Sequence, residues 1–231
     1  MRLDKLLANK AFGSRKEVHQ IIRDGRVTVN GAVILKKDQS IHIDDIIEVD
    51  GVQISTKQQY YIKFHKPAGY ITAVEDPTHP VVMDLLPPEF KKMGVFPVGR
   101  LDKDTEGLLL LTNDGIWAHS IINGHKHVPK VYYVEFNGKL TKDGLERIET
   151  GIVLGDGTQC KPANIDVLSE QSLHITIEEG KYHQVKRMIG AAGGEVTYLK
   201  RLSIGHITLN GIEAINTYSE IDDQDVVDFK K

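Results

Sequence analysis

Three acidic side chains alternate along one short segment that also contains an arginine. Arg100 is followed by Asp102, Asp104 and Glu106, and Gly107 comes next. The alternation imitates the opening of an EF-hand loop, whose oxygen ligands bind calcium. A second interpretation is a catalytic carboxylate beside a cation that holds a phosphate. A third is that the acids are solvated turn residues, which is the usual state of an isolated acidic triplet.

The calcium interpretation fails on two counts. The twelfth loop position is Asn113, where a bidentate glutamate is required, and the flanks lack helices. Pro97 and Gly99 precede the segment, and the apolar run 108–111 that follows is typical of a strand. A loop held against a rigid sheet by such a strand favours a functional site, although it does not identify the reaction.

The chain from residue 60 onward alternates between strand-like and helical runs. β-branched and aromatic residues predict strands at 60–64, 108–111, 131–136, 173–177 and 207–209. Helices are predicted at 116–122, 141–149 and 183–192, the last ending at Gly193 and Gly194. The connections are too irregular for repeated βαβ units. The pattern predicts an α+β fold with a mixed, mostly antiparallel sheet flanked by helices.

The first fifty residues predict a separate small module of two helices and a hairpin sheet. Leucines at 3, 6 and 7 have helical spacing, and Ser14 with Glu17 forms the pattern of a capping box for a second helix. That helix is expected to end at Gly25 and to leave its basic residues in solvent. Asn30-Gly31 and Asp50-Gly51 are strong signals for tight turns between short strands.

Charge is distributed unevenly along the chain. Residues 1–37 carry nine Lys and Arg against three acids, a net charge of +6. Residues 38–59 and 213–231 each carry −4, and residues 60–212 carry −1. The net charge of −3 for the whole chain therefore hides a basic N-terminal module, whose positive face suits the phosphate backbone of structured RNA.

Composition sets the general class of the protein. The 231 residues are 40% hydrophobic and 26% charged, which is typical of globular domains, and no apolar run approaches the ~18 residues of a membrane span. The start of the chain lacks the pattern of a secretory signal, and Cys160 is the only cysteine. We expect a cytoplasmic protein without membrane contact, in which Cys160 has no chemical role.

The N-terminal module resembles the S-four-type RNA-binding module, also called the alpha-L motif. The likeness rests on segments 2–7, 14–15, 21–27 and 29–31, and it implies RNA as a partner. The polar segment 55–59 is the expected linker, which predicts an RNA-binding domain at 1–58 and a second domain at 59–231. The expected RNA-binding residues of the module are Arg2, Arg15, Lys16, Arg23 and Arg26.

The second domain resembles pseudouridine synthases of the RsuA branch. The likeness rests on segments 66–70, 98–115, 130–132 and 179–188, so that with the module it covers nearly the whole chain. Segment 182–188, Tyr-His-Gln-Val-Lys-Arg-Met, looks most like the small-subunit members of that branch. The resemblance implies a pseudouridine synthase catalytic domain that acts on small-subunit ribosomal RNA.

The resemblance also implies roles for individual residues. The essential aspartate nucleophile falls on Asp102, the active-site tyrosine on Tyr132, and the basic partner of the aspartate on Lys186, where many relatives have arginine. Tyr132 would stack on a base that has left the RNA helix. Arg100 and Arg187 are expected phosphate partners.

The implied reaction breaks the N1–C1′ bond of uridine and rejoins the ring through C5, so it requires no redox cofactor or metal. A carboxylate can attack C1′ or assist base departure through a glycal, and both routes stay open. The expected substrate is small-subunit (16S) ribosomal RNA or an assembling small subunit, bound by a monomer. The alternatives are the same chemistry on large-subunit RNA and a non-catalytic RNA-binding assembly factor.

Overall fold

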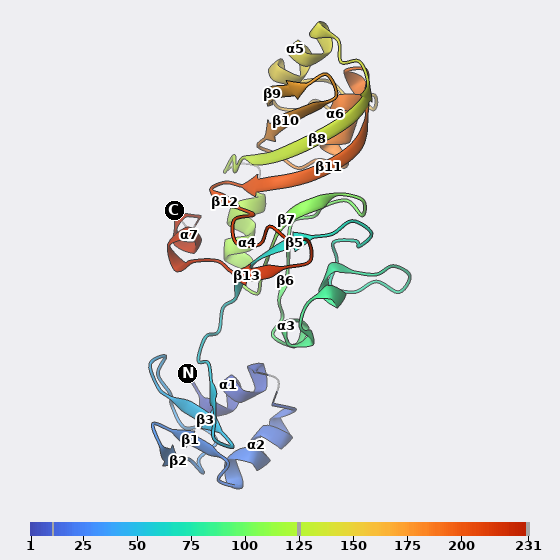
Figure 1. The fold of residues 1–231 in the computed structure, drawn as a ribbon. Helices are drawn as coiled ribbons and strands as arrows, with labels where there is room; N and C mark the ends of the chain where they lie inside the picture. The colour runs from blue at the N-terminus through green and yellow to red at the C-terminus, as the bar shows by residue number, and fades with distance from the viewer. Residues whose placement is uncertain (11, 124–125, 230–231) are drawn as a thin grey trace. The chain divides into compact units, whose positions relative to one another are not determined.

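The computed structural model describes residues 1–10, 12–123 and 126–229. The chain divides into two compact units (Figure 1). One unit comprises residues 1–60 and 86–95, and the other comprises residues 61–85 and 96–231. No helix in the described part of the chain is long and apolar enough to cross a membrane.

The smaller unit contains a four-stranded antiparallel sheet in the order β2-β1-β3-β4. Leu3, Leu6 and Leu7 of the first helix are buried with Val18 and Ile22 of the second. Its elements are α1 (Leu3–Asn9), α2 (Arg15–Arg23), β1 (Val27–Val29), β2 (Ala32–Val33), β3 (Ile47–Val49), β4 (Val52–Ile54) and α3 (Pro88–Lys92).

Local sequence signals explain why this unit folds as expected. The Ser14 hydroxyl accepts from the backbone of Glu17, and the Glu17 carboxylate accepts from the backbone of Ser14, so the predicted capping box is confirmed. Both residues of Asn30-Gly31 have positive φ, at 51° and 78°, as a type I′ turn requires. Asp50-Gly51 repeats this geometry between β3 and β4.

The larger unit is built on one mixed sheet of nine strands within the described residues. Its strands are β5 (Tyr61–Lys66), β6 (Phe96–Val98), β7 (Glu106–Thr112), β8 (Lys130–Gly138), β9 (Asn164–Ser169), β10 (Ser172–Ile177), β11 (Gly194–Ile204), β12 (Ile207–Thr208) and β13 (Tyr218–Glu220). Its helices are the 3₁₀ helix η1 (Val82–Leu85), α4 (Gly115–Ile122), α5 (Lys142–Thr150), α6 (Gln184–Ala191) and α7 (Asp223–Asp228).

The strand order is β13-β5-β7-β11-β8-β10-β9, with β6 also paired to β7 and β12 to β11. Among the described strands, β7 and β11 form the one parallel pair, with Arg201 opposite Gly107. The mixed, mostly antiparallel sheet is therefore confirmed. The sequence pattern missed β11, which is the longest strand and lies between β7 and β8.

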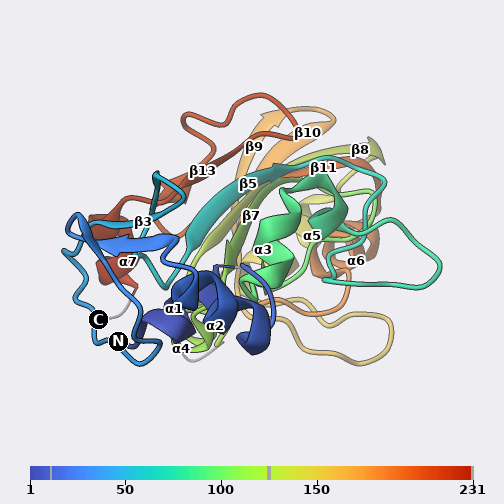
Figure 2. The same ribbon diagram turned by 90° about the horizontal axis from the view of Figure 1, so that it is seen from below.

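Helices flank the sheet of the larger unit, as predicted. Helix α6 packs against β11, α5 against β9 and α4 against β6. Figure 2 shows α5 and α6 near β8 and β11. Trp117 of α4 has no exposed surface, and its ring makes edge contacts with Tyr61 of β5 and with Phe229. This packing gives the strands around β7 a rigid support.

Candidate active site

A buried lysine anchors the loop that carries Asp102. Lys66, at the end of β5, has no exposed surface, and its Nζ lies within hydrogen-bond distance of four backbone carbonyl oxygens. These belong to Pro67 (3.0 Å), Asp102 (3.1 Å), Lys103 (3.3 Å) and Thr105 (2.8 Å). An ammonium group that links this many carbonyls fixes the loop before any substrate arrives.

The segment after β5 adds further bonds to the same loop. The Thr72 hydroxyl donates to the carbonyl of Leu101 at 2.8 Å and accepts from its N–H at 3.1 Å. The backbone N–H of Gly69 donates to the carbonyl of Lys103 at 2.7 Å. Through these contacts, segment 66–72 positions segment 98–107, which carries Asp102.

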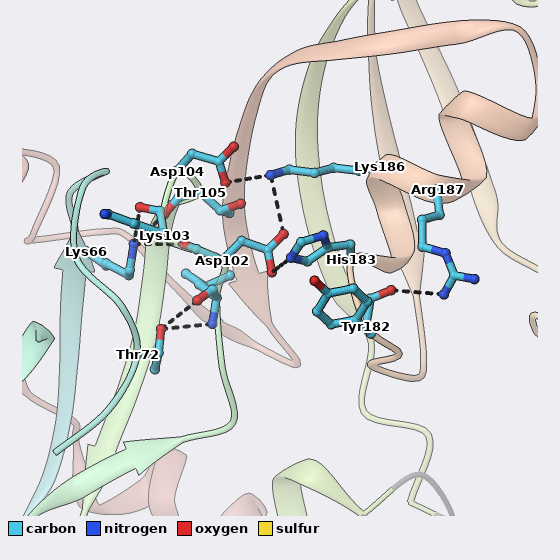
Figure 3. A network of polar contacts seen from close by, with 11 residues as sticks. Lys66, Thr72, Asp102, Lys103, Asp104, Thr105, Tyr182, His183, Lys186 and Arg187 are labelled. Atoms are coloured by element: carbon cyan, nitrogen blue, oxygen red, sulfur yellow. Dashed lines mark hydrogen bonds and ion pairs between the residues drawn. The ribbon is translucent and has the colours of Figure 1, made fainter. Parts of the chain in front are cut away.

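Asp102 lies between two basic side chains contributed by the start of α6. Its Oδ2 is 3.4 Å from Lys186 Nζ, and its Oδ1 is 3.5 Å from His183 Nε2 (Figure 3). The Asp102 side chain is about a quarter exposed. It is therefore held beside a cation and within reach of a substrate.

Lys186 is shared between two carboxylates. Its Nζ donates to Asp104 Oδ1 at 2.5 Å, closer than its contact with Asp102. Burial raises the pKa of Asp104, but the hydrogen bond and charge of Lys186 outweigh burial and hold that pKa below its usual value. Lys186 thus lies beside Asp102, with Asp104 as its nearer partner.

The turn before α6 positions His183 against Asp102. His183 adopts a left-handed backbone with φ 46°, and the ring of Tyr182 stacks on it at 3.9 Å between centroids. Gln184, which is buried, accepts from the backbone of Lys181 and donates to Glu179 at 2.7 Å. This backbone conformation is costly for a residue other than glycine, so it persists only where the surrounding contacts stabilise it.

Asp102 opens onto a cavity of about 390 Å³ in the larger unit. Tyr132 of β8 and Arg100 also line the cavity. Tyr132 is 7% exposed, and Arg100 is exposed. The volume falls within the range of ~300–1,000 Å³ that is typical of small-ligand pockets. The structure therefore brings Asp102, Tyr132, Lys186 and Arg100 to one site.

Three residues at this site were not assigned from the sequence. Lys66 and His183 lie within segments 66–70 and 179–188, whose resemblance to the family assigns neither of them a role. Arg201 of β11 is 3% exposed and lines the cavity, with its Nη1 3.4 Å from the Tyr132 hydroxyl. The register of β11 against β8, which pairs Arg201 with Tyr132, is the signal that would have identified it.

The predicted RNA-binding residues of the smaller unit divide into two groups. Arg15, Lys16 and Arg23 of α2 are exposed, and Lys16 and Arg23 line a groove with Lys36 and Lys37. The sequence did not single out Lys36 and Lys37 as RNA-binding residues. Their place beside α2 extends the positive face that the charge count predicts.

The other predicted RNA contacts already have acidic partners. Arg2 binds Asp4 at 2.7 Å. Arg26 binds both oxygens of Asp50, at 2.9 and 2.5 Å. In the larger unit, Arg187 lies 2.6 Å from Asp156, outside the cavity lining. Each would have to share or exchange its partner to bind a phosphate.

The described residues contain neither a metal-binding cluster nor a cysteine in an environment that favours its reactive form. No group of three or more His, Cys, Asp or Glu side chains there has the arrangement of a metal site. Cys160 is buried, and burial raises the pKa of its thiol, which disfavours the reactive thiolate.

The sequence and the fold of the chain both match those of known proteins. The sequence model of the RNA pseudouridylate synthase family matches residues 60–191, and that of the S4 domain matches residues 1–47. The chain therefore belongs to the RNA pseudouridylate synthase family, a family of isomerases, and it carries an N-terminal S4 domain. The resemblance found in the motifs is confirmed.

Individual relatives match the chain over nearly its full length. The uncharacterized RNA pseudouridine synthase YtzG of Bacillus subtilis is 42% identical over 233 residues, which cover 98% of this chain and 97% of YtzG. Ribosomal small subunit pseudouridine synthase A of Escherichia coli is 35% identical over 232 residues, 98% of each chain. A crystal structure of a pseudouridylate synthase gives a TM-score of 0.68 at 29% identity and covers 99% of both chains.

Proposed function

We propose that this protein isomerises one uridine of small-subunit (16S) ribosomal RNA to pseudouridine, with Asp102 as the nucleophile. The observation that carries the proposal is the position of Asp102, between Lys186 and His183 at a cavity lined by Tyr132. The likeness to relatives named for the ribosomal small subunit supports this RNA as the substrate.

The reaction proceeds on a base that has left the RNA stack and entered the cavity. Asp102 attacks C1′ or assists departure of the base, and the N1–C1′ electron pair leaves with the uracil ring. The ring turns and C5 bonds to C1′, while the ester bond between Asp102 and C1′ breaks or, on the glycal route, the proton that left C2′ returns to it. The proton on C5 is then lost and N1 gains a proton. Atoms and charge balance without an oxidant or reductant.

Each neighbouring residue has a distinct task in this proposal. Lys186 orients Asp102 as a point charge, without the two-pronged contact that an arginine would make. Tyr132 stacks on the uracil ring and assists removal of the C5 proton. Arg100, which is exposed where the cavity opens, binds a phosphate of the flipped nucleotide.

We further propose that residues 1–58 dock the RNA while residues 59–231 carry out the reaction. The exposed cations of α2 and the adjoining groove suit a phosphate backbone. Arg2, Arg26 and Arg187 contribute by exchanging their present carboxylate partners for phosphate. Because the proposed substrate is ribosomal RNA, the proposed site of the reaction is the cytoplasm.

Site-resolved pseudouridine mapping tests the proposed function. Cells that lack this protein are expected to lose one pseudouridine from small-subunit RNA, and the purified protein is expected to restore it on isolated RNA or on assembling subunits. Loss of a site in large-subunit RNA would reassign the substrate. An unchanged map together with an inactive purified protein would refute the proposed activity.

The pKa of Lys66 predicts how the rate depends on pH. Burial, followed by the charge of Arg201, lowers this pKa to about 8, although neighbouring carboxylates raise it in part. Below pH 8 the ammonium form predominates and offers three N–H donors. Above pH 8 one donor is lost and the catalytic loop loosens, so we expect kcat to fall as pH rises through about 8.

A pH–rate profile under single-turnover conditions checks this prediction. Lys130 is the matched control, because burial lowers its pKa to about 8 as well but its Nζ donates to Val128, outside the loop. The decline should persist in Lys130→Met, whatever the absolute rate. A decline that disappears in this variant would assign the titration to Lys130 instead.

The three exposed cations of α2 predict a measurable salt dependence. Replacing Arg15, Lys16 and Arg23 together with glutamine should weaken RNA binding. A plot of the logarithm of the association constant against the logarithm of salt concentration should become less steep, by about 2 to 3, since about three fewer counterions are released. The control exchanges three exposed cations of the larger unit, Lys139, Lys142 and Arg147, for glutamine. Equal slopes for the two triple variants would mean that the cations of α2 only promote solubility.

A further inference from the structure

Arg201 is a buried cation with an unused donor at the candidate active site. It lies on β11, paired with Gly107 of β7 and with Tyr132 of β8. Its Nε donates to the carbonyl of Leu108 at 2.7 Å, and its Nη1 lies 3.4 Å from the Tyr132 hydroxyl. Its Nη2 is buried and has no hydrogen-bond partner among the described residues. A buried, unsatisfied donor is costly and requires an explanation.

The charge of Arg201 has no ion-pair partner among the residues that the structure describes. None of the ion pairs within the described part of the chain, defined by N–O distances up to 4.0 Å, includes this side chain. Lys130, a second cation, lines the same cavity. Burial of an unpaired guanidinium favours a ligand that brings negative charge or a strong acceptor to this place.

Depth distinguishes the two arginines of the cavity. Arg100 is exposed, whereas Arg201 is 3% exposed and contacts the hydroxyl of Tyr132. The phosphates of a nucleotide stay connected to the rest of the RNA, so they remain where the cavity opens. The part that reaches the buried guanidinium is the base, and the acceptors of uracil are its O2 and O4 carbonyl oxygens.

We propose that Arg201 is a catalytic residue whose Nη2 donates a hydrogen bond to a carbonyl oxygen of the flipped uracil and stabilises the anion that the ring becomes. This inference rests on the proposed function. When the N1–C1′ bond breaks, its electron pair moves into the ring, and the negative charge spreads to O2 and O4. The hydrogen bond is stronger to this anion than to neutral uracil, so it lowers the barrier.

The inference holds for both open routes of the reaction. Direct attack of Asp102 on C1′ and departure through a glycal both release uracil with the same electron pair. The competing explanation is that Arg201 only braces β7 through its bond to Leu108. A brace would affect folding, but it would not respond to a change of one oxygen in the substrate.

The experiment combines variants of Arg201 with single-atom changes in the RNA. Single-turnover rates are measured for the wild type, Arg201→Gln and Arg201→Lys on RNA that carries uridine, 2-thiouridine or 4-thiouridine at the mapped position. Arg201→Gln should lower kcat on the order of 100-fold with little change in KM, the usual loss for an oxyanion donor. Arg201→Lys, which keeps a cation, should recover part of the rate.

The sulfur substitutions provide the deciding comparison. We define the thio effect as the ratio of the rate on uridine to the rate on the sulfur-substituted nucleotide. Sulfur accepts hydrogen bonds weakly, so at the contacted carbonyl this ratio should differ between wild type and Arg201→Gln by about tenfold or more. At the other carbonyl the effect should be equal in both enzymes. Effects of sulfur on the ring itself act on both enzymes and cancel in this comparison.

The outcomes separate the inference from the proposed function. Equal thio effects at both carbonyls, or an unchanged kcat in Arg201→Gln, would refute the role of Arg201 while leaving an active wild type in place. An inactive wild type would refute the proposed function instead. If circular dichroism shows that Arg201→Gln is unfolded, the thio comparison is made with Arg201→Lys, whose shorter donor should likewise reduce the effect.

Arg147 supplies the matched control. It lies on α5, and like Arg201 it donates to a backbone carbonyl, that of Ala191, at 2.9 Å. It is exposed and does not line the cavity. Arg147→Gln should keep the wild-type rate and both wild-type thio effects, and a changed thio effect in this variant would overturn the assignment to Arg201.

Discussion

Asp102→Asn is expected to abolish pseudouridine formation, with a loss of about 10⁴-fold or more in kcat, because the amide is a poor nucleophile and carries no charge. The variant should fold normally. Lys186 keeps its 2.5 Å bond to Asp104, so removal of the Asp102 charge does not leave a cation without a partner. RNA affinity should stay within about threefold of the wild type, since the cations on α2 are unchanged.

Asp104→Asn is the matched control for this prediction. It makes the same chemical change two residues away, at a side chain that is 73% exposed and bound to the same lysine. We expect its turnover to stay within about tenfold of the wild type, because Lys186 can still pair with Asp102. Tritium release from RNA labelled at C5 of uridine measures both variants. Turnover by Asp102→Asn would show that another group attacks C1′.

The two variants also bear on what the sequence could predict about the site. By type and spacing alone, Asp102, Asp104 and Glu106 were equivalent candidates, and the family resemblance singled out Asp102. In the structure their surroundings differ. Asp102 faces the cavity, Asp104 points to solvent beside Lys186, and Glu106 accepts a hydrogen bond from Tyr198 at 2.6 Å. These differences arise from contacts with residues far away in the sequence.

The elements that were predicted well are those with local signals. The capping box at Ser14 and the turn at Asn30-Gly31 each involve residues within four positions of one another, so the sequence pattern contains the whole interaction. The leucine run of β7 is similarly explicit, because a short, wholly apolar segment is typical of a strand buried on both faces.

Strand β11 was missed because its partners are distant in the sequence. Lys200 and Arg201 suggest a solvent-exposed segment, and the glycines at 193 and 194 were interpreted only as the end of a helix. The strand instead pairs with β7 and β8, which lie some sixty to ninety residues earlier, and so buries Arg201. The place of Arg201 beside Tyr132 follows from this distant pairing, so no local sequence pattern indicates it.

The parallel pairing of β7 with β11 depends on one glycine. Gly107 has φ 108°, a backbone region that side chains with a Cβ rarely adopt. A Cβ at this position would lie 2.2 Å from the carbonyl oxygen and 2.6 Å from the nitrogen of Arg201. Both are backbone atoms of a central strand, so they have no flexible side chain that could move aside.

Gly107→Ala should therefore lower the free energy of unfolding of the larger unit by about 3 kcal/mol or more, from backbone strain and overpacking together. Urea unfolding followed by tryptophan fluorescence measures this loss, because Trp117 is the only tryptophan and lies buried in this unit. Gly115→Ala is the control, since a Cβ there meets no atom within 4 Å. At the start of α4 it should leave stability unchanged or raise it by up to about 1 kcal/mol. Equal urea midpoints for the two variants would mean that β7 and β11 can separate without cost, and Arg201 would then lack the fixed position on which its contact with the uracil ring depends.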